Sequence, residues 1–122
     1  MTKRMIAALI SVAGATPLSA LADGDAAHGR RIYESRCIAC HSPDANRVGP
    51  MHRGIFGRKA GSVASYNYSN AVKASDVVWN DETLDQWLTN PQAFIPGQKM
   101  NFKVANPQDR ADIIAYLKTL TN

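Results

Sequence analysis

The five residues from Cys37 to His41 place the tightest constraint on this 122-residue chain. They read Cys-Ile-Ala-Cys-His, and the chain has no other cysteine. Two thiols three residues apart, near a helix end, can both reach one edge of a porphyrin and form thioether bonds. The imidazole that follows is then aimed at the metal. The spacing therefore predicts covalent attachment of one c-type haem through Cys37 and Cys40.

Two other interpretations of the cysteine pair are a disulfide and a thioredoxin-like redox pair. A thioredoxin-like pair follows a strand and opens a helix, and the sequence around Cys37 does not read that way. Neither interpretation accounts for a histidine directly after Cys40. A dithiol redox protein is therefore the weakest of three functional hypotheses.

His41 is predicted to bind the iron on one face of the haem through a neutral imidazole. Its second ring nitrogen then needs an acceptor, which would fix the tautomer. The carbonyl of Pro50, in the run Val48-Gly49-Pro50, can supply one.

Four residues are candidates for the opposite face of the iron: His28, Met51, His52 and Met100. Met100 is favoured because it follows a Pro-Gly turn in a loop far along the chain from His41. Met51 lies directly after the Pro50 strap and is expected to be a packing methionine. His28 is expected to be exposed at a helix start, and His52 is not assigned.

Histidine and methionine ligation raises the reduction potential of a haem. With both axial positions filled, the iron has no site for oxygen, peroxide or substrate, which predicts an electron carrier and no enzyme. The alternative is a haem enzyme or gas sensor in which Met100 leaves the iron. The sequence shows no acid and base pair beside the iron, which disfavours this alternative.

The N-terminus has the layout of a secretory signal peptide, with Lys3 and Arg4, an uncharged stretch over 5–15, and Ala20-Leu21-Ala22 before Asp23. We expect cleavage after Ala22, a single domain over 23–122, and export to the periplasm. A membrane span needs about 20 apolar residues. The uncharged stretch is shorter, so we expect no permanent membrane anchor.

The full chain has 14 basic and 10 acidic residues, and the predicted leader holds two of the basic ones and none of the acidic ones. The remaining chain is therefore only mildly basic, with a net charge of +2. It has no dense basic run with interleaved aromatic residues, so nucleic acid is not an expected partner. We expect a monomer.

The pattern of caps and apolar residues predicts an all-α domain with about four to five helices. Helices are expected over 25–37, 69–74 and 81–89, with Pro91 ending the third, and a last helix starts at Pro107 after the cap Asn106. The first and last helices should pack together. The loops over 42–68 and 91–105 are long for a small domain and need a group to organise around.

The chain resembles the class I c-type cytochrome family, in particular its soluble mitochondrial-like and bacterial electron carriers. The resemblance implies the cytochrome c fold, with long loops wrapped around one covalently attached haem. It is carried by Gly29, Tyr33, the haem motif, Gly49-Pro50, Gly54-Ile55-Phe56-Gly57-Arg58-Lys59, Tyr68-Ser69, Trp79, Pro96-Gly97-Gln98-Lys99-Met100, Phe102 and Arg110 through Leu117.

The resemblance also implies roles for individual residues. His41 and Met100 would be the axial ligands, and Pro50 the acceptor for the His41 ring. Phe102 would cover the haem beside its exposed edge. Three further positions match family residues that hydrogen-bond a buried haem propionate, namely Arg58, Tyr68 and Trp79.

A carrier of this kind would shuttle electrons between redox proteins. The implied partners are a cytochrome bc-type complex, a terminal oxidase, a photosynthetic reaction centre or a periplasmic dehydrogenase. They would dock at the haem edge by electrostatic steering. The basic side chains expected around that edge are Arg36, Lys73, Lys99 and Lys103.

The chain departs from the family pattern at several positions. His52 and Arg53 stand where a leucine and a histidine are usual. Trp87 and Val72 replace a tyrosine and an asparagine of mitochondrial members, which changes the polarity expected near the methionine sulfur. The loop after Met100 lacks a usual glycine and is one residue shorter, so its path is not predicted.

Overall fold

The computed structural model describes residues 10–11, 13–14 and 23–122, so most of the predicted leader lies outside the described residues. Five α-helices and one turn of π-helix form the fold: α1 (Ala26–Ile32), η1 (Tyr33–Cys37), α2 (Asn70–Ala74), α3 (Asp81–Thr89), α4 (Pro91–Phe94) and α5 (Pro107–Thr119). The described residues form no strand, and a single isolated bridge joins Lys59 and Val78. The all-α prediction is confirmed.

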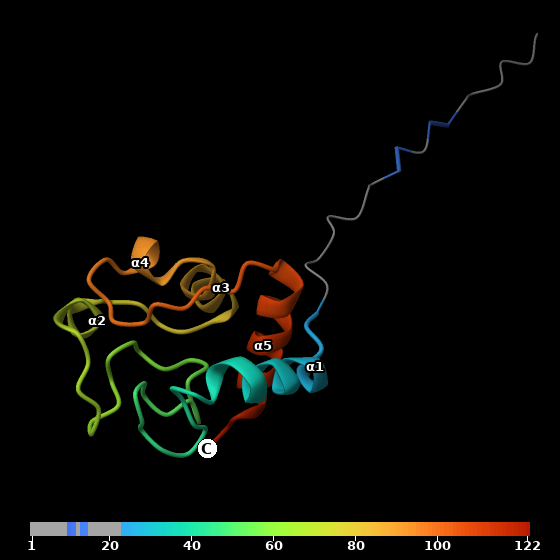
Figure 1. The fold of residues 1–122 in the computed structure, drawn as a ribbon. Coiled ribbons are helices and arrows are strands. Elements are labelled where there is room, and N and C mark those ends of the chain that lie inside the picture. Colours follow the sequence, from blue (N-terminus) through green and yellow to red (C-terminus); the bar gives the residue numbers. More distant parts are fainter. Residues whose placement is uncertain (1–9, 12, 15–22) are drawn as a thin grey trace, which may run out of the picture.

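The helices near the two ends of the described domain, α1 and α5, cross in close contact (Figure 1). Gly29 of α1 makes this approach possible. A Cβ atom placed on Gly29 would lie 1.8 Å from the carbonyl oxygen of Asp112 in α5. The predicted packing of the first and last helices is therefore confirmed, and backbone meets backbone at its centre.

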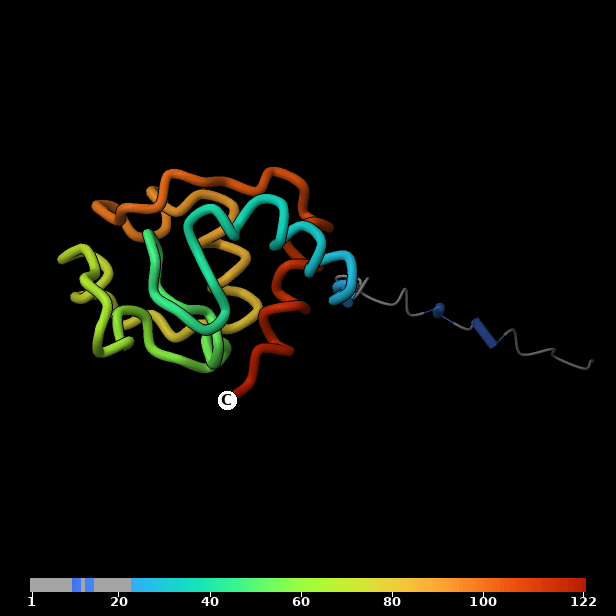
Figure 2. Tube along the Cα trace, turned by 60° about the horizontal axis from the view of Figure 1, so that its bottom comes forward, coloured from blue at the N-terminus to red at the C-terminus, as the bar shows by residue number. Residues whose placement is uncertain are grey.

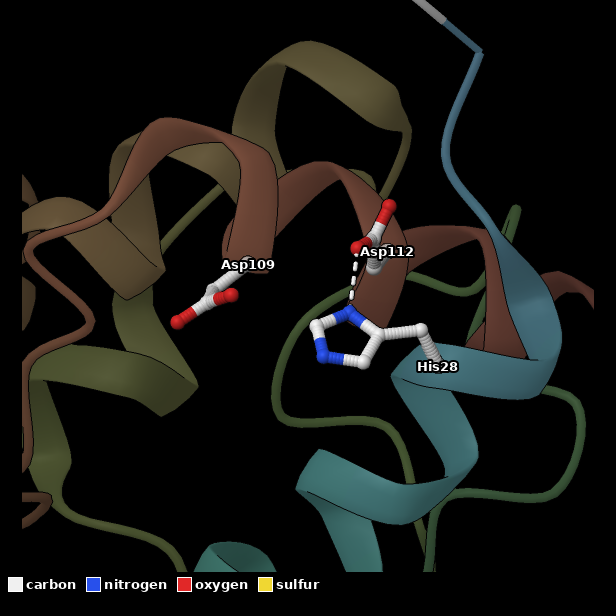
Figure 3. Close-up of side chains that lie close together, drawn as sticks. All are labelled: His28, Asp109 and Asp112. Carbon is white, nitrogen blue, oxygen red and sulfur yellow. Dashed lines mark hydrogen bonds and ion pairs between the residues drawn. The ribbon is translucent and has the colours of Figure 1, made fainter.

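A side-chain tie reinforces the crossing (Figure 3). Nδ1 of His28 in α1 lies 2.6 Å from a carboxylate oxygen of Asp112, whose side chain is nearly inaccessible. The other oxygen of Asp112 accepts hydrogen bonds from the Asp25 N–H at 2.7 Å and from Gln108 Nε2 at 2.9 Å. His28 lies at a helix start, as expected, with its side chain 40% exposed, and Asp112 holds one nitrogen of its ring against α5.

Asp109 lies beside this pair, one turn earlier on α5 (Figure 3). Among the described residues, His28, Asp109 and Asp112 form a group whose potential metal-ligand atoms all lie within 4.8 Å of one another. Both oxygens of Asp112 already accept hydrogen bonds from the protein. The group is therefore explained as a helix-to-helix tie.

Side-chain caps begin the helices at the predicted places. The side chains of Asp25, Ser69, Asn80 and Asn106 accept hydrogen bonds from the first N–H groups of α1, α2, α3 and α5. Asn80 does so within a capping box. Short polar residues that precede helical patterns thus set the starts of these helices.

Two details differ from the prediction. The helix expected over 25–37 widens into the π turn η1 after Ile32, with the Ile38 N–H bonded to the Tyr33 carbonyl. An apolar pattern does not reveal this, because the two helix types differ by one residue in hydrogen-bond offset. Pro91 was expected to start a loop, but it opens α4, since Asn90 caps that helix and proline suits a first helical position.

The two long loops lie on opposite sides of the molecule in Figure 2, with the segment before α5 (orange) along the top and the segment around residue 60 (green) along the bottom. Backbone hydrogen bonds tie the first to helix α3 and the second to the segment between α2 and α3. The Val104 N–H donates to the Leu88 carbonyl at 2.8 Å, and the Gly57 N–H donates to the Trp79 carbonyl at 2.7 Å. No helix in the described ranges is long and apolar enough to cross a bilayer.

Replacing Gly29 with alanine should lower the free energy of unfolding by about 3 kcal/mol, because the new methyl group overlaps the Asp112 carbonyl and forces the helices apart. Arg30→Ala in the same helix is the matched control. It removes only an exposed ion pair with Glu34 and should cost about 0.5 kcal/mol. Urea unfolding of the holoproteins measures both, and equal stabilities would contradict the close crossing.

Asp112→Asn should make the free energy of unfolding less dependent on pH in the acid range. Burial alone would raise the pKa of Asp112, but the hydrogen bonds from Asp25, His28 and Gln108 bring it below the ordinary 3.8. A lowered carboxyl pKa stabilises the fold above pH 3.8, and this contribution is lost as the pH falls through the folded value. The variant should lose about 1–3 kcal/mol at neutral pH, with a difference that narrows near pH 2. A difference that is constant with pH would contradict the tie.

Candidate functional site

A cavity of about 480 Å³ lies between the helices and the two long loops. This volume falls within the range of small-molecule and cofactor sites. The structure brings all nine predicted site residues to its wall, together with His52, Val72 and Trp87. The nine are Cys37, Cys40, His41, Pro50, Arg58, Tyr68, Trp79, Met100 and Phe102.

Cys37 ends η1 and Cys40 lies in the turn that follows, and the two form no disulfide with each other. A tight turn holds them, since the N–H groups of Cys40 and His41 both donate to the Cys37 carbonyl, at 3.1 and 2.9 Å. Burial raises the pKa of the Cys37 thiol to about 11. Dithiol oxidoreductases need the opposite shift to form a nucleophilic thiolate, so the raised pKa of Cys37 disfavours the redox-pair interpretation.

The His41 ring is fixed at one nitrogen. Its Nδ1 donates to the Pro50 carbonyl, with 2.9 Å between the two atoms. A carbonyl only accepts, so the proton of the neutral ring is on Nδ1 and Nε2 keeps a free lone pair. Burial lowers the pKa of His41, against the opposing effect of the Pro50 bond, which favours the neutral ring that binds metals.

Gly49 leaves the space that this ring occupies. A Cβ atom on Gly49 would lie 2.1 Å from Cε1 of His41. Position 49 therefore requires glycine, because any side chain there would overlap the His41 ring. Gly49 leaves room for the ring, and the carbonyl of Pro50 bonds its Nδ1.

His52 lies against His41. The two ring centroids are 4.0 Å apart and the ring planes differ by 21°. Nδ1 of His52 is also 2.9 Å from the Tyr33 hydroxyl. Burial, together with the neighbouring His41 and Arg58, lowers the pKa of His52 well below its ordinary value. Sequence reasoning left His52 unassigned, and its unusual position before Arg53 was the only signal.

The two candidate methionines are separated by the structure. Met100 lines the cavity, and its N–H donates to the side-chain oxygen of Gln98. Met51 is not part of the cavity wall, and its carbonyl accepts from Arg58 Nη2 at 2.9 Å. Met100, and not Met51, is therefore the methionine that can present its sulfur to the cavity.

Arg58 provides a test of whether an anionic group fits the cavity. Its Nη1 donates to the Arg53 carbonyl at 3.1 Å and its Nη2 to the Met51 carbonyl. Its Nε is buried and has no hydrogen-bond partner among the described residues. Buried donors are nearly always paired, so this nitrogen fits an acceptor from a bound group.

Tyr68 supplies a second donor on the same wall. Its hydroxyl oxygen accepts from the Val63 N–H at 3.1 Å, which leaves its own proton available. Trp79 is buried and packs edge-on against Trp87, with 5.4 Å between ring centroids. The mostly apolar wall and these few donors suit a flat hydrophobic group that carries carboxylates, and the residues present therefore fit haem.

The loop after Met100, whose path was not predicted, is anchored by Val104, which is 1% exposed. Arg110 of α5 holds the same point, since its Nη1 donates to the Val104 carbonyl at 2.9 Å. Phe102 lies between these anchors and Met100, partly exposed at the rim of the cavity.

Comparison with known proteins gives a consistent result. The Cytochrome c family model matches residues 26–121. Cytochrome c of Euglena viridis is 47% identical over 100 residues, which cover 80% of this chain and 98% of that protein. Cytochrome c2 of Rhodomicrobium vannielii is 44% identical over 116 residues and 92% of each chain.

A solved structure agrees with the sequence matches. Cytochrome cH from Methylobacterium extorquens has a TM-score of 0.75 and 44% identity, over 79% of this chain and 99% of that one. The class I resemblance and the cytochrome c fold are thus confirmed, as is haem c attached through Cys37 and Cys40. The chain belongs to the cytochrome c family of electron carriers.

Proposed function

We propose that this protein is a periplasmic one-electron carrier whose haem iron is bound by His41 and Met100. The observation that carries the proposal is the pairing of the two ligands at one cavity. His41 has Nδ1 committed to Pro50 and Nε2 free, and Met100 reaches the same cavity from the distant loop before α5.

Haem c supplies a one-electron iron couple when it is bound. In the proposal, Cys37 and Cys40 hold the ring by thioether bonds, and Pro50 keeps His41 in the tautomer that binds iron. Met100 would supply the second protein ligand to the iron. Because no position is left for a substrate, we propose that the protein is a carrier and not an enzyme.

Arg58, Tyr68 and Trp79 are proposed to bind a haem propionate. The unpartnered Nε of Arg58 and the free hydroxyl proton of Tyr68 support this assignment. Hydrogen bonds to a charged acceptor are stronger than those between neutral groups, so these contacts offset the loss of hydration. Phe102 at the cavity rim is proposed to cover the haem beside its exposed edge.

The proposed place of the carrier is the periplasm, after cleavage of the leader 1–22. The donor and acceptor would be drawn from cytochrome bc-type complexes, terminal oxidases, photosynthetic reaction centres and periplasmic dehydrogenases. Docking would use basic side chains near the cavity mouth. Arg36 and Lys99 line the cavity, and Lys73 and Lys103 are exposed.

Met100→Ala should abolish the weak far-red absorption band of sulfur-bound ferric haem and lower the reduction potential, since thioether ligation favours ferrous iron. Met51→Ala is the matched control and should keep both properties, because Met51 does not line the cavity. A redox titration monitored by absorption measures both. Loss of the band in the Met51 variant, or its retention in the Met100 variant, would reverse the assignment.

The mouth of the cavity should carry a positive potential. Oxidation of the ferrous protein by ferricyanide, an anion, should therefore slow as ionic strength rises, while a cationic cobalt complex should react faster. Lys99→Glu should weaken the salt dependence with ferricyanide. Lys118→Glu is the control, because Lys118 lies off the cavity and pairs with Asp81. Stopped-flow rates that do not change with salt would argue against basic docking.

A further inference from the structure

His52 is not one of the two predicted iron ligands, yet its ring is held by contacts on two sides. One face of its ring stacks on His41 at 4.0 Å between centroids, and its Nδ1 contacts the Tyr33 hydroxyl at 2.9 Å. Tyr33 is 1% exposed, and its ring packs against Tyr116 of α5 at 5.1 Å. A chain of contacts thus runs from the α1 and α5 crossing through Tyr33 and His52 to His41.

The Pro50 hydrogen bond fixes which nitrogen of His41 carries the proton, but one contact at one edge of a ring does not fix the ring plane. An imidazole bound to a metal through Nε2 can still turn about the metal–nitrogen axis. A flat neighbour stacked at 4.0 Å opposes that turn, because rotation would drive the edge of one ring into the face of the other.

The same geometry shows that His52 is not a trans ligand. Two ligands on opposite faces of a haem have the iron between them. The rings of His41 and His52 are nearly parallel and in direct contact, with no room for a haem between them. A role for His52 must therefore act on the His41 side of the site.

We propose that His52 is a positioning residue that sets the plane of the His41 imidazole by stacking on it, and that the Tyr33 hydroxyl holds His52 in register. This inference rests on the proposed function, in which His41 binds the iron. Contacts beyond the ligands themselves orient an axial histidine and tune the metal. The plane of the axial imidazole controls how unpaired spin is distributed over a ferric haem, so the role has a spectroscopic signature.

The experiment compares the haem-loaded wild type with His52→Leu and His52→Phe. Leucine fits the apolar wall but offers no flat face, whereas phenylalanine keeps a flat face and loses the ring nitrogens. The readouts are the proton NMR shifts of the haem methyl groups in the ferric state and the midpoint potential. His52→Leu should change the order or spread of the methyl shifts and displace the potential. His52→Phe keeps the flat face but loses the Tyr33 contact, so it should keep the wild-type order with only a small displacement of the shifts.

Tyr33→Phe tests the anchor. It removes one hydroxyl and keeps the buried ring, so it should shift the methyl resonances in the same direction as His52→Leu by a smaller amount. A wild-type pattern in this variant would remove Tyr33 from the proposal. A wild-type pattern in His52→Leu, or an equal change in His52→Leu and His52→Phe, would overturn the stacking role.

The wild-type spectrum separates this inference from the proposed function. Hyperfine-shifted resonances of the His41 ring and of the Met100 methyl group must be present if these residues bind the iron. Their absence would contradict the proposed function. Their presence, together with an unchanged His52→Leu spectrum, would contradict only the positioning role.

Discussion

The close crossing of α1 and α5 is the constraint on which the rest of the structure depends. A missing side chain at Gly29 lets the α1 backbone reach the Asp112 carbonyl, and the His28–Asp112 contact holds the pair together. The axis of α1 then directs η1 and delivers Cys37 to the cavity wall. Because Tyr33 lies in η1 and packs on α5, the same crossing also determines where the Tyr33 hydroxyl stands.

Within the site, backbone carbonyls orient the functional side chains by accepting hydrogen bonds from them. The Pro50 carbonyl fixes the His41 proton, and the carbonyls of Met51 and Arg53 hold two nitrogens of Arg58. One short loop therefore orients both an imidazole and a guanidinium toward one cavity. The remaining Arg58 nitrogen has no protein acceptor, which links the burial of that side chain to the binding of a charged group.

Much of this could be predicted from local chemistry. The Cys-Ile-Ala-Cys-His run predicts the cofactor because few other groups require two thiols and an imidazole at that spacing. Capping residues such as Asn80 and Asn106 predict helix starts, because the first N–H groups of a helix have no carbonyl partner within the helix. The side chains of these two residues accept hydrogen bonds from such N–H groups. These signals depend on neighbours in sequence and remain valid whatever the tertiary fold.

The features that were missed depend on contacts between distant residues. The contact of His28 with Asp112 joins residues far apart in the chain, and the stacking of His52 on His41 depends on Tyr33 and α5. Periodicity and propensity carry no information about such pairings, so these residues could be named as candidates but not placed.

The two helices of the α1 and α5 crossing are made at different times, because they lie near opposite ends of the described domain. A polypeptide that emerges N-terminus first presents Cys37 and Cys40 long before Asp112 has left the ribosome. The partner that immobilises α1 does not yet exist at that stage. The attachment motif is thus made before its helix has a partner, and the α1 and α5 crossing can form only after the thirteen residues of α5 have been made.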